Sequence, residues 1–198
     1  MNFLAHTYFA GDNHKKIVGS FIADYVKGRD YNKYSKDIRD GILLHRLIDS
    51  FIDNNTIAKE SGSLFAEKYR RYKKVVIDIV YDHFLAKHWD RFSEISLREY
   101  THKIHKILLS NFIHIPNRMK IWLPAFISRK QLVDYAEIKG IEKVLVNMGK
   151  HTSLPSEAHF AIQIIEANLQ TLEQQFFSYM KEAQIYTDKV IDNPEKYL

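Results

Sequence analysis

The sequence predicts an all-α fold, a single bundle of helices. Glycine and proline are scarce, with 7 and 4 residues in a chain of 198. Long segments place apolar residues three and four positions apart, which is the spacing of one helix face, and no strand-rich pattern interrupts them. A hydrophobic content of 45% is enough to bury one core, so residues 1–198 are expected to form one domain.

The first helices are predicted from this apolar spacing. Residues 14–27 form a helix that ends at Gly28, because glycine readily takes the left-handed conformation of a helix stop. A polar loop leads to a second helix over residues 36–53, and a third covers residues 56–70. The inward side chains of the first two helices are Ile17, Val18, Phe21, Ile22 and Tyr25, then Ile38, Ile42, Leu44, Leu47, Ile48 and Phe51.

The later helices follow the same rule up to the end of the chain, where the last residues are expected to be frayed. Proline marks an irregular stretch in the middle and the start of the last helix. These elements are the helices 72–92, 97–112, 129–135, 138–149 and 156–190, the irregular stretch around Pro116 and Pro124, and the frayed tail 192–198.

Composition limits the classes of site and partner. Lys and Arg number 29 against 24 Asp and Glu, a formal charge of +5 that favours an acidic partner without identifying it. Cysteine is absent, which excludes disulfides, thiolate nucleophiles and cysteine-bound zinc, so a metal would bind to His, Asp, Glu or water. The sequence has neither a secretory signal nor an apolar stretch of about 20 residues, so we expect a cytoplasmic protein with no membrane contact.

Metal-capable side chains lie where the helical pattern predicts core residues. On the second helix His45, Asp49 and Asp53 are spaced four apart and form a polar row, with Arg46 at neighbouring positions. Asp24 lies beside the apolar face of the first helix. Each of these could be a solvated group, and the row could be braced by the arginine, whereas a buried carboxylate must be paired or metal-bound.

Two further places offer such side chains. Asp82 and His83 each end an apolar row of the helix 72–92, and His88 follows about a turn later, while His6 lies near the chain start. The alternatives are a satisfied core pair for Asp82 and His83, and a loose chain end for His6. Together these residues favour a site for manganese, magnesium, iron or zinc, ions that activate water and bind phosphoryl oxygens during phosphoester hydrolysis.

At these residues the chain resembles the acyl carrier protein phosphodiesterase family. The segments that carry the resemblance are 1–6 (MNFLAH), 19–26 (GSFIADYV), 41–49 (GILLHRLID), Asp53-Asn54, 81–85 (YDHFL) and His88-Trp89. They are specific in combination and cover about the first half of the chain, whereas the second half is similar in length and character.

The resemblance implies an all-helical, divergent HD-type phosphohydrolase that uses manganese. Its reaction releases 4'-phosphopantetheine from holo acyl carrier protein and leaves the apo form. The usual HD set contains a His-Asp doublet, whereas this chain has the reverse order, Asp82-His83. The metal ligands that the resemblance implies are Asp24, His45, Asp82 and His83, followed by His6, Asp49 and Asp53.

The resemblance also implies roles for other side chains. Arg46 would stabilise charge on the phosphate or only brace Asp49, and His83 or His88 would protonate the leaving serine oxygen. The acidic carrier would meet a basic surface, although ordinary solvated faces explain the same lysines and arginines. The candidates for this surface are Lys33, Lys36, Arg39, Arg70, Arg71, Lys73 and Lys74.

Two other functions stay open at this point. The same metal site could hydrolyse a nucleotide or another small phosphoester. A basic helical module that binds nucleic acid and no metal is the least expected, because it leaves the inward carboxylates unexplained.

Overall fold

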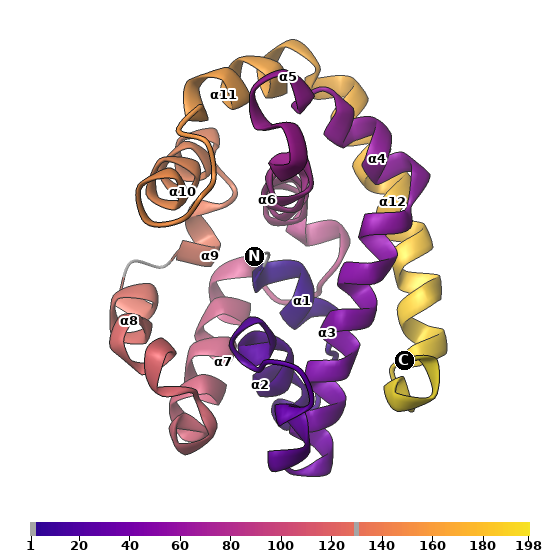
Figure 1. The fold of residues 1–198 in the computed structure, drawn as a ribbon, viewed down its shortest axis with the longest axis vertical. Coiled ribbons are helices and arrows are strands. Elements are labelled where there is room, and N and C mark those ends of the chain that lie inside the picture. Colours follow the sequence, from indigo (N-terminus) through magenta and orange to yellow (C-terminus); the bar gives the residue numbers. More distant parts are fainter. Residues whose placement is uncertain (1–2, 129–130) are drawn as a thin grey trace.

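The computed structural model describes residues 3–128 and 131–198, and every regular element in this part of the chain is helical, which confirms the predicted fold class (Figure 1). The α-helices are α1 (Phe3–Phe9), α2 (His14–Ile22), α3 (Lys36–Asn54), α4 (Thr56–Ser63), α5 (Ala66–Tyr69), α6 (Lys73–Lys87), α7 (Leu97–Ser110), α8 (Asn117–Ser128), α9 (Gln131–Asp134), α10 (Ile138–His151), α11 (Ala158–Ala167) and α12 (Leu169–Val190). Short 3₁₀ helices are η1 (Ala23–Tyr25), η2 (Asp30–Lys33), η3 (Arg70–Tyr72), η4 (Trp89–Arg91), η5 (Phe112–His114) and η6 (Pro194–Tyr197).

Helix α1 lies in the middle of the molecule, between α6 on one side and the pair α2 and α3 on the other (Figure 1). One hydrophobic core surrounds it. Leu4 of α1 is fully buried in this core together with Ile17, Ile42 and Val80 from the three neighbouring helices. The central place of α1 carries the polar side chain of His6 into the interior.

Helices α2 and α3 approach each other so closely that their backbones touch. Gly19 and Gly41 make this possible, because a Cβ on either residue would overlap a backbone carbonyl group of the partner helix. Asp24 follows directly after α2, and His45 lies one turn after Gly41. The close approach therefore fixes how these two side chains lie relative to each other.

Helix α6 packs against α1, α4 and α10, and α12 covers α3, α4 and α6. Every residue of α6 from Val76 to Ala86 is buried except Asp78. A helix surrounded by core in this way places its polar residues in contact with other elements rather than with solvent. Asp82 and His83 lie in this stretch.

Several predicted helix boundaries are confirmed, and three predicted helices are wrong in length or continuity. The helix predicted over 14–27 is too long, because α2 ends at Ile22 and the 3₁₀ helix η1 follows. The helix predicted over residues 36–53 agrees with α3. The continuous helix over 56–70 is wrong because tight turns at Leu64 separate α4 from α5. The continuous helix over 156–190 is also wrong, because the Asn168 side chain donates to the carbonyl oxygen of Ile164 at 2.9 Å and competes with the helical backbone.

The stretch around Pro116 and Pro124, predicted to be irregular, is helix α8. Pro116 precedes the first turn, where its missing N–H costs nothing, and Pro124 is accommodated inside the helix. Of the helix predicted over 129–135, residues 129 and 130 lie outside the described residues, and α9 covers the next four positions.

Both ends of the described chain are more ordered than expected. Helix α1 begins at Phe3, where a loose chain start was the alternative for His6. The tail forms η6 instead of fraying: Pro194 is buried, and the Arg39 guanidinium lies 3.6 Å from the Glu195 carboxylate. Among the helices described, none is both long and apolar enough to cross a membrane.

Candidate metal centre

Helix α1 holds His6 in a fixed place because both α6 and α2 bind its backbone. The backbone N–H groups of Leu4 and Ala5 donate to the Asp82 carboxylate at 3.1 and 2.9 Å. A carboxylate at this position satisfies amide groups that a helix start leaves free and interacts well with the helix dipole. The Ser20 hydroxyl donates to the carbonyl oxygen of His6 at 2.9 Å.

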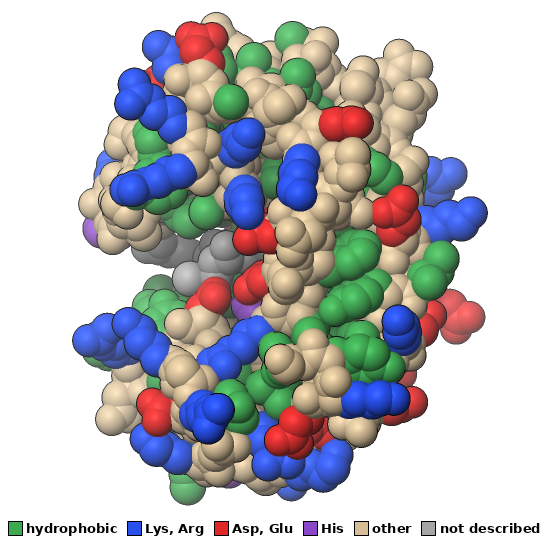
Figure 2. Space-filling view, turned by 45° about the vertical axis from the view of Figure 1, so that its right-hand side comes forward, with side chains coloured by type: hydrophobic (Ala, Val, Ile, Leu, Met, Phe, Trp, Pro, Cys, Tyr) green, Lys and Arg blue, Asp and Glu red, His purple; other side chains and the backbone are tan. Residues whose placement is uncertain are grey.

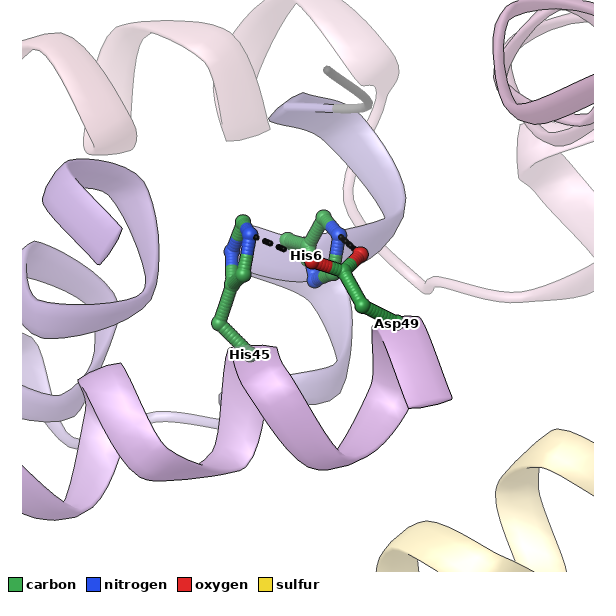
Figure 3. A group of neighbouring side chains, drawn as sticks. All are labelled: His6, His45 and Asp49. Carbon is green, nitrogen blue, oxygen red and sulfur yellow. Dashed lines mark hydrogen bonds and ion pairs between the residues drawn. The ribbon is translucent and has the colours of Figure 1, made fainter. Parts of the chain in front are cut away.

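His45 and Asp49 lie one turn apart on α3 and point toward His6 on α1 (Figure 3). The two imidazole rings stack, with their centroids 3.6 Å apart and their planes 14° apart. The Asp49 carboxylate bridges them: Oδ1 is 3.1 Å from His6 Nε2, and Oδ2 is 3.2 Å from His45 Nε2. Two helices that are distant in the sequence thus present one compact polar group.

Asp24 joins this group from η1, with Oδ1 3.4 Å from His45 Nε2. Arg46 holds the loop that follows, because its two terminal nitrogens donate to the carbonyl oxygens of Gly28 and Val26 at 2.8 and 2.7 Å. The structure therefore turns the Arg46 guanidinium toward backbone groups next to Asp24, and Arg46 makes no pair with Asp49.

The imidazoles form the buried side of the group and the carboxylates its open side. The side chains of His6 and His45 are 5% and 6% exposed, whereas those of Asp24 and Asp49 are 36% and 47% exposed. Figure 2 shows a cleft with histidine and acidic side chains at its inner end, the kinds of side chain found in this group. A ligand would reach the carboxylates first.

The surroundings separate the pKa values of the two histidines. Burial lowers the pKa of His45, but the hydrogen bonds to Asp24 and Asp49 outweigh it and raise the pKa to about 9. Burial and the adjacent His45 charge lower the pKa of His6 to about 4. Burial alone would raise the pKa of Asp49, yet His45 and His6 hold it below its usual value. Without a metal, His45 is therefore protonated and His6 neutral at pH 7.

His6, His45 and Asp49 fit a divalent cation. Each offers one ligand atom, and these atoms lie within 4.8 Å of one another. Two imidazole nitrogens and a carboxylate oxygen suit manganese, iron or zinc. The Nδ1 atoms of both histidines are buried and have no hydrogen-bond partner among the residues described. Since metal ligands must be deprotonated, an ion here would replace the proton of His45.

The structure does not bring Asp82 and His83 into this group. The carboxylate of Asp82 is fully buried at the start of α1, and burial raises its pKa to about 7 against the two amide hydrogen bonds. The imidazole of His83 points elsewhere, with Nδ1 2.8 Å from the carbonyl oxygen of Tyr135. Neighbouring residues on a helix point about 100° apart, which is why the pair separates.

Two other predicted site residues also have partners outside the group. His88 Nε2 lies 2.6 Å from the Glu173 carboxylate of α12. Asp53, one turn beyond Asp49 on α3, pairs with Lys74 at 2.9 Å. The ion pair places the first turn of α6 beside the candidate metal centre.

The predicted basic residues fall into two sets. Those near the first loop have local partners: Lys33 pairs with Asp30 at 2.7 Å, and Lys36 pairs with Asp40 at 2.6 Å. Those before and in the first turn of α6 lie beside α3 through the Lys74 pair. Lys and Arg side chains also gather on the upper lip of the cleft (Figure 2). The second set is Arg70, Arg71, Lys73 and Lys74.

Sequence reasoning missed Asp78 and Tyr179, which lie near the carboxylates of the site. Burial raises the pKa of Asp78 to about 7. The positive charge of the N-terminal amino group opposes this shift, and the charges of Asp49, Asp82 and Asp53 add to it. Burial, followed by the charge of Asp78, raises the pKa of Tyr179 well above its usual value. The spacing of four between Asp78 and Asp82 could have identified Asp78 from the sequence. No local sequence pattern identifies Tyr179.

The chain is similar to known proteins over nearly its whole length. A family model described as acyl carrier protein phosphodiesterase matches residues 1–183. A curated relative of that name from Yersinia pestis is 31% identical over 93% of this chain and 98% of the relative. Another, from Photorhabdus laumondii, is 32% identical over 92% of this chain and 94% of the relative. No solved structure matches the chain.

Proposed function

Because the chain belongs to the acyl carrier protein phosphodiesterase family, which consists of phosphodiester hydrolases, we propose that it releases 4'-phosphopantetheine from holo acyl carrier protein. One observation carries this proposal. His6, His45 and Asp49 come from two separate helices and bring their ligand atoms within 4.8 Å of one another, behind carboxylates that reach solvent. This donor set suits a divalent cation, for which we propose manganese.

In this proposal His6, His45 and Asp49 would hold the ion, and Asp24 lies next to them, with Oδ1 3.4 Å from His45 Nε2. When bound, such an ion lowers the pKa of water and neutralises charge on phosphoryl oxygens. Asp24 and Asp49 are the exposed members of the group, so their carboxylates orient the attacking water and accept its hydrogen bonds.

The reaction consumes one water molecule. The water oxygen bonds to the phosphorus of the diester, and the bond between phosphorus and the serine oxygen of the carrier breaks. The hydroxyl stays on phosphorus, and the proton ends on the serine oxygen. In the transition state negative charge develops on the phosphoryl oxygens. A site with cationic character stabilises this charge and so lowers the barrier.

Arg46 serves as a positioning residue in this proposal. Its guanidinium donates hydrogen bonds to the carbonyl oxygens of Val26 and Gly28 and lies 5.2 Å from the centre of the Tyr31 ring. These contacts fix the loop that follows Asp24, so Arg46 supports the exposed carboxylate rather than the phosphate.

The carrier's acidic surface is proposed to dock on the cations at the start of α6. This set lies beside the centre because Lys74 pairs with Asp53, one turn from Asp49. Opposite charges on the two proteins would increase the rate of encounter and orient the arm toward the site. The cations are Arg70, Arg71, Lys73 and Lys74.

The test is the mass of purified holo carrier protein after incubation with this protein and manganese. The wild type and the surface variant Asp90→Asn should reduce the carrier's mass by that of the phosphopantetheine arm, and His45→Gln should leave it intact. Circular dichroism would establish that each variant is folded. An unchanged carrier mass with folded, manganese-supplied wild type would overturn the proposal.

A further inference from the structure

Helix α8 is apolar on its outer face as well as on its inner face. Met119, Leu123 and Phe126 form the inner face and are buried in the core. On the outer face Ile121 is 83% exposed, and Pro124, three residues later, is also exposed. A helix on the surface of a globular domain ordinarily turns polar residues to water. The outer face of α8, at the edge of the molecule in Figure 1, therefore suits a partner with apolar groups.

The turn that leads into α8 extends this surface. Leu109, in the last turn of α7, and Phe112 and Ile113 of η5 are exposed, and Ile113 is 82% exposed. The Lys120 ammonium lies 5.2 Å from the centre of the Phe112 ring, which holds η5 beside the first turn of α8. Single exposed apolar residues are ordinary, whereas large ones gathered in one segment mark an interaction site. We call Leu109, Phe112, Ile113 and Ile121 the apolar tip.

The chain around the apolar tip carries only positive charge. Residues 100–133 contain no Asp or Glu. Lys106 of α7 and Arg118 of α8 are exposed, and neither side chain has an ion pair or hydrogen bond with another residue in the described part of the chain. Lys106 lies three residues before Leu109, and Arg118 lies three residues before Ile121. Each cation therefore shares a helix face with an apolar side chain of the tip.

This combination selects among partners. A second copy of the chain would bring cations against cations, and nucleic acid offers no apolar layer for exposed isoleucine side chains. An anionic lipid bilayer offers both complements, since its headgroups attract cations and the boundary of its acyl layer accepts aliphatic side chains. We propose that the apolar tip binds the surface of an anionic bilayer, with α8 lying at the level of the headgroups.

The proposal goes beyond the proposed function and revises one expectation from the sequence. No membrane contact was expected because the chain has no apolar stretch of about 20 residues, which is the length that spans a bilayer. A helix that lies on the bilayer surface needs only one apolar face flanked by cations. The outer face of α8 meets this smaller requirement with Ile121, Pro124 and Arg118.

The experiment is cosedimentation of the purified protein with lipid vesicles of two compositions. One is phosphatidylcholine alone, and the other contains phosphatidylcholine and phosphatidylglycerol in equal amounts. The wild type should bind the anionic vesicles about tenfold more tightly than the neutral ones, and added salt should reduce this difference. The tip variant, Arg118→Gln with Ile121→Gln, should bind the anionic vesicles about tenfold more weakly than the wild type.

The matched control is Lys181→Gln with Ile185→Gln on α12. Both residues are exposed and lie one turn apart, so this variant loses one cation and one isoleucine from a different surface. It should bind both kinds of vesicle like the wild type. Circular dichroism would establish that both variants are folded.

The proposal is overturned if the wild type binds neither kind of vesicle, or binds both equally. Equal binding of anionic vesicles by the wild type and the tip variant would also overturn it. If the tip variant instead raised the KM for holo carrier protein with vesicle binding unchanged, the tip would serve an acidic protein. If the wild type formed a dimer that the tip variant lost, the tip would serve a second copy.

These outcomes are separate from the test of the proposed function. No residue of the apolar tip belongs to the group formed by His6, His45 and Asp49. The tip variant should therefore still remove the arm from holo carrier protein in solution. Loss of vesicle binding leaves the hydrolase proposal standing, and an unchanged carrier mass leaves the bilayer proposal standing.

Discussion

His45 is the residue whose charge balances the site when no ion is bound. Its folded pKa of about 9 lies above the ordinary value of 6.5. A raised pKa stabilises the fold fully below the unfolded value, and the stabilisation is lost as the pH rises through the folded value. Between pH 7 and pH 9 the metal-free protein therefore loses the contribution of this imidazolium.

We predict that metal-free wild type loses about 1–3 kcal/mol of its unfolding free energy between pH 7 and pH 9, since one pKa unit corresponds to about 1.4 kcal/mol. His45→Gln cannot titrate in this range and should lose much less. Urea unfolding of both proteins at the two pH values measures the difference. A parallel loss in wild type and variant would contradict the assignment of the charge to His45.

At the scale of secondary-structure elements, the start of α1 is stabilised by the Asp82 carboxylate. Asp82→Ala removes the acceptor of the Leu4 N–H group, and a buried amide group without a partner costs about 1–3 kcal/mol. We predict a loss of that size in urea unfolding, accompanied by weaker Mn²⁺ binding, because α1 carries His6. Asp82→Asn retains one acceptor oxygen and should lose less stability than Asp82→Ala. If both variants kept wild-type stability and only Mn²⁺ binding fell, Asp82 would be a ligand rather than a cap.

The contact between α2 and α3 sets the spacing of Asp24 and His45. Gly41→Ala would force a Cβ into the backbone of α2, and overpacking of this kind costs about 1–3 kcal/mol. We expect reduced stability and reduced carrier hydrolysis, since His45 lies one turn away. Gly62→Ala is the matched control in α4, where a new Cβ would meet only ordinary contacts, the nearest at 3.8 Å. Equal effects of the two substitutions would count against a special role of the close approach.

At the scale of the whole molecule, local sequence patterns predicted some residues of the candidate metal centre and missed others. The pair His45 and Asp49 was predicted because a spacing of four on one helix fixes a shared face without any tertiary information. His6 was ranked low because a chain start is often loose. The order of α1 depends on a cap from Asp82, which lies on a distant helix and which no local pattern reveals.

The same limit applies to the fold. Long apolar periodicity predicted α3 well because burial reinforces helix formation along its whole length. The breaks at Leu64 and Asn168 were missed, since they depend on tight turns and on one side-chain hydrogen bond that an apolar pattern does not reveal. The HD-type arrangement and the ligand list remain predictions.

Recognition of the carrier protein is proposed to depend on the cations at the start of α6, which are Arg70, Arg71, Lys73 and Lys74. We predict that Arg71→Gln with Lys73→Gln raises the KM for holo carrier protein several-fold with little change in kcat, and that added salt reduces the difference. Lys33→Gln with Lys36→Gln should have a smaller effect, because those lysines pair with Asp30 and Asp40. Steady-state kinetics at low and high ionic strength measure this. Salt-independent KM values in all three proteins would argue against electrostatic docking.

The most direct test of the metal centre is pulsed electron paramagnetic resonance of the protein loaded with one equivalent of Mn²⁺. The account predicts nuclear modulation from directly bound histidine nitrogens, reduced in both His6→Gln and His45→Gln and unchanged in Asp90→Asn. Bound Mn²⁺ without any histidine nitrogen signal in the wild type would contradict the central claim that α1 and α3 together hold the ion.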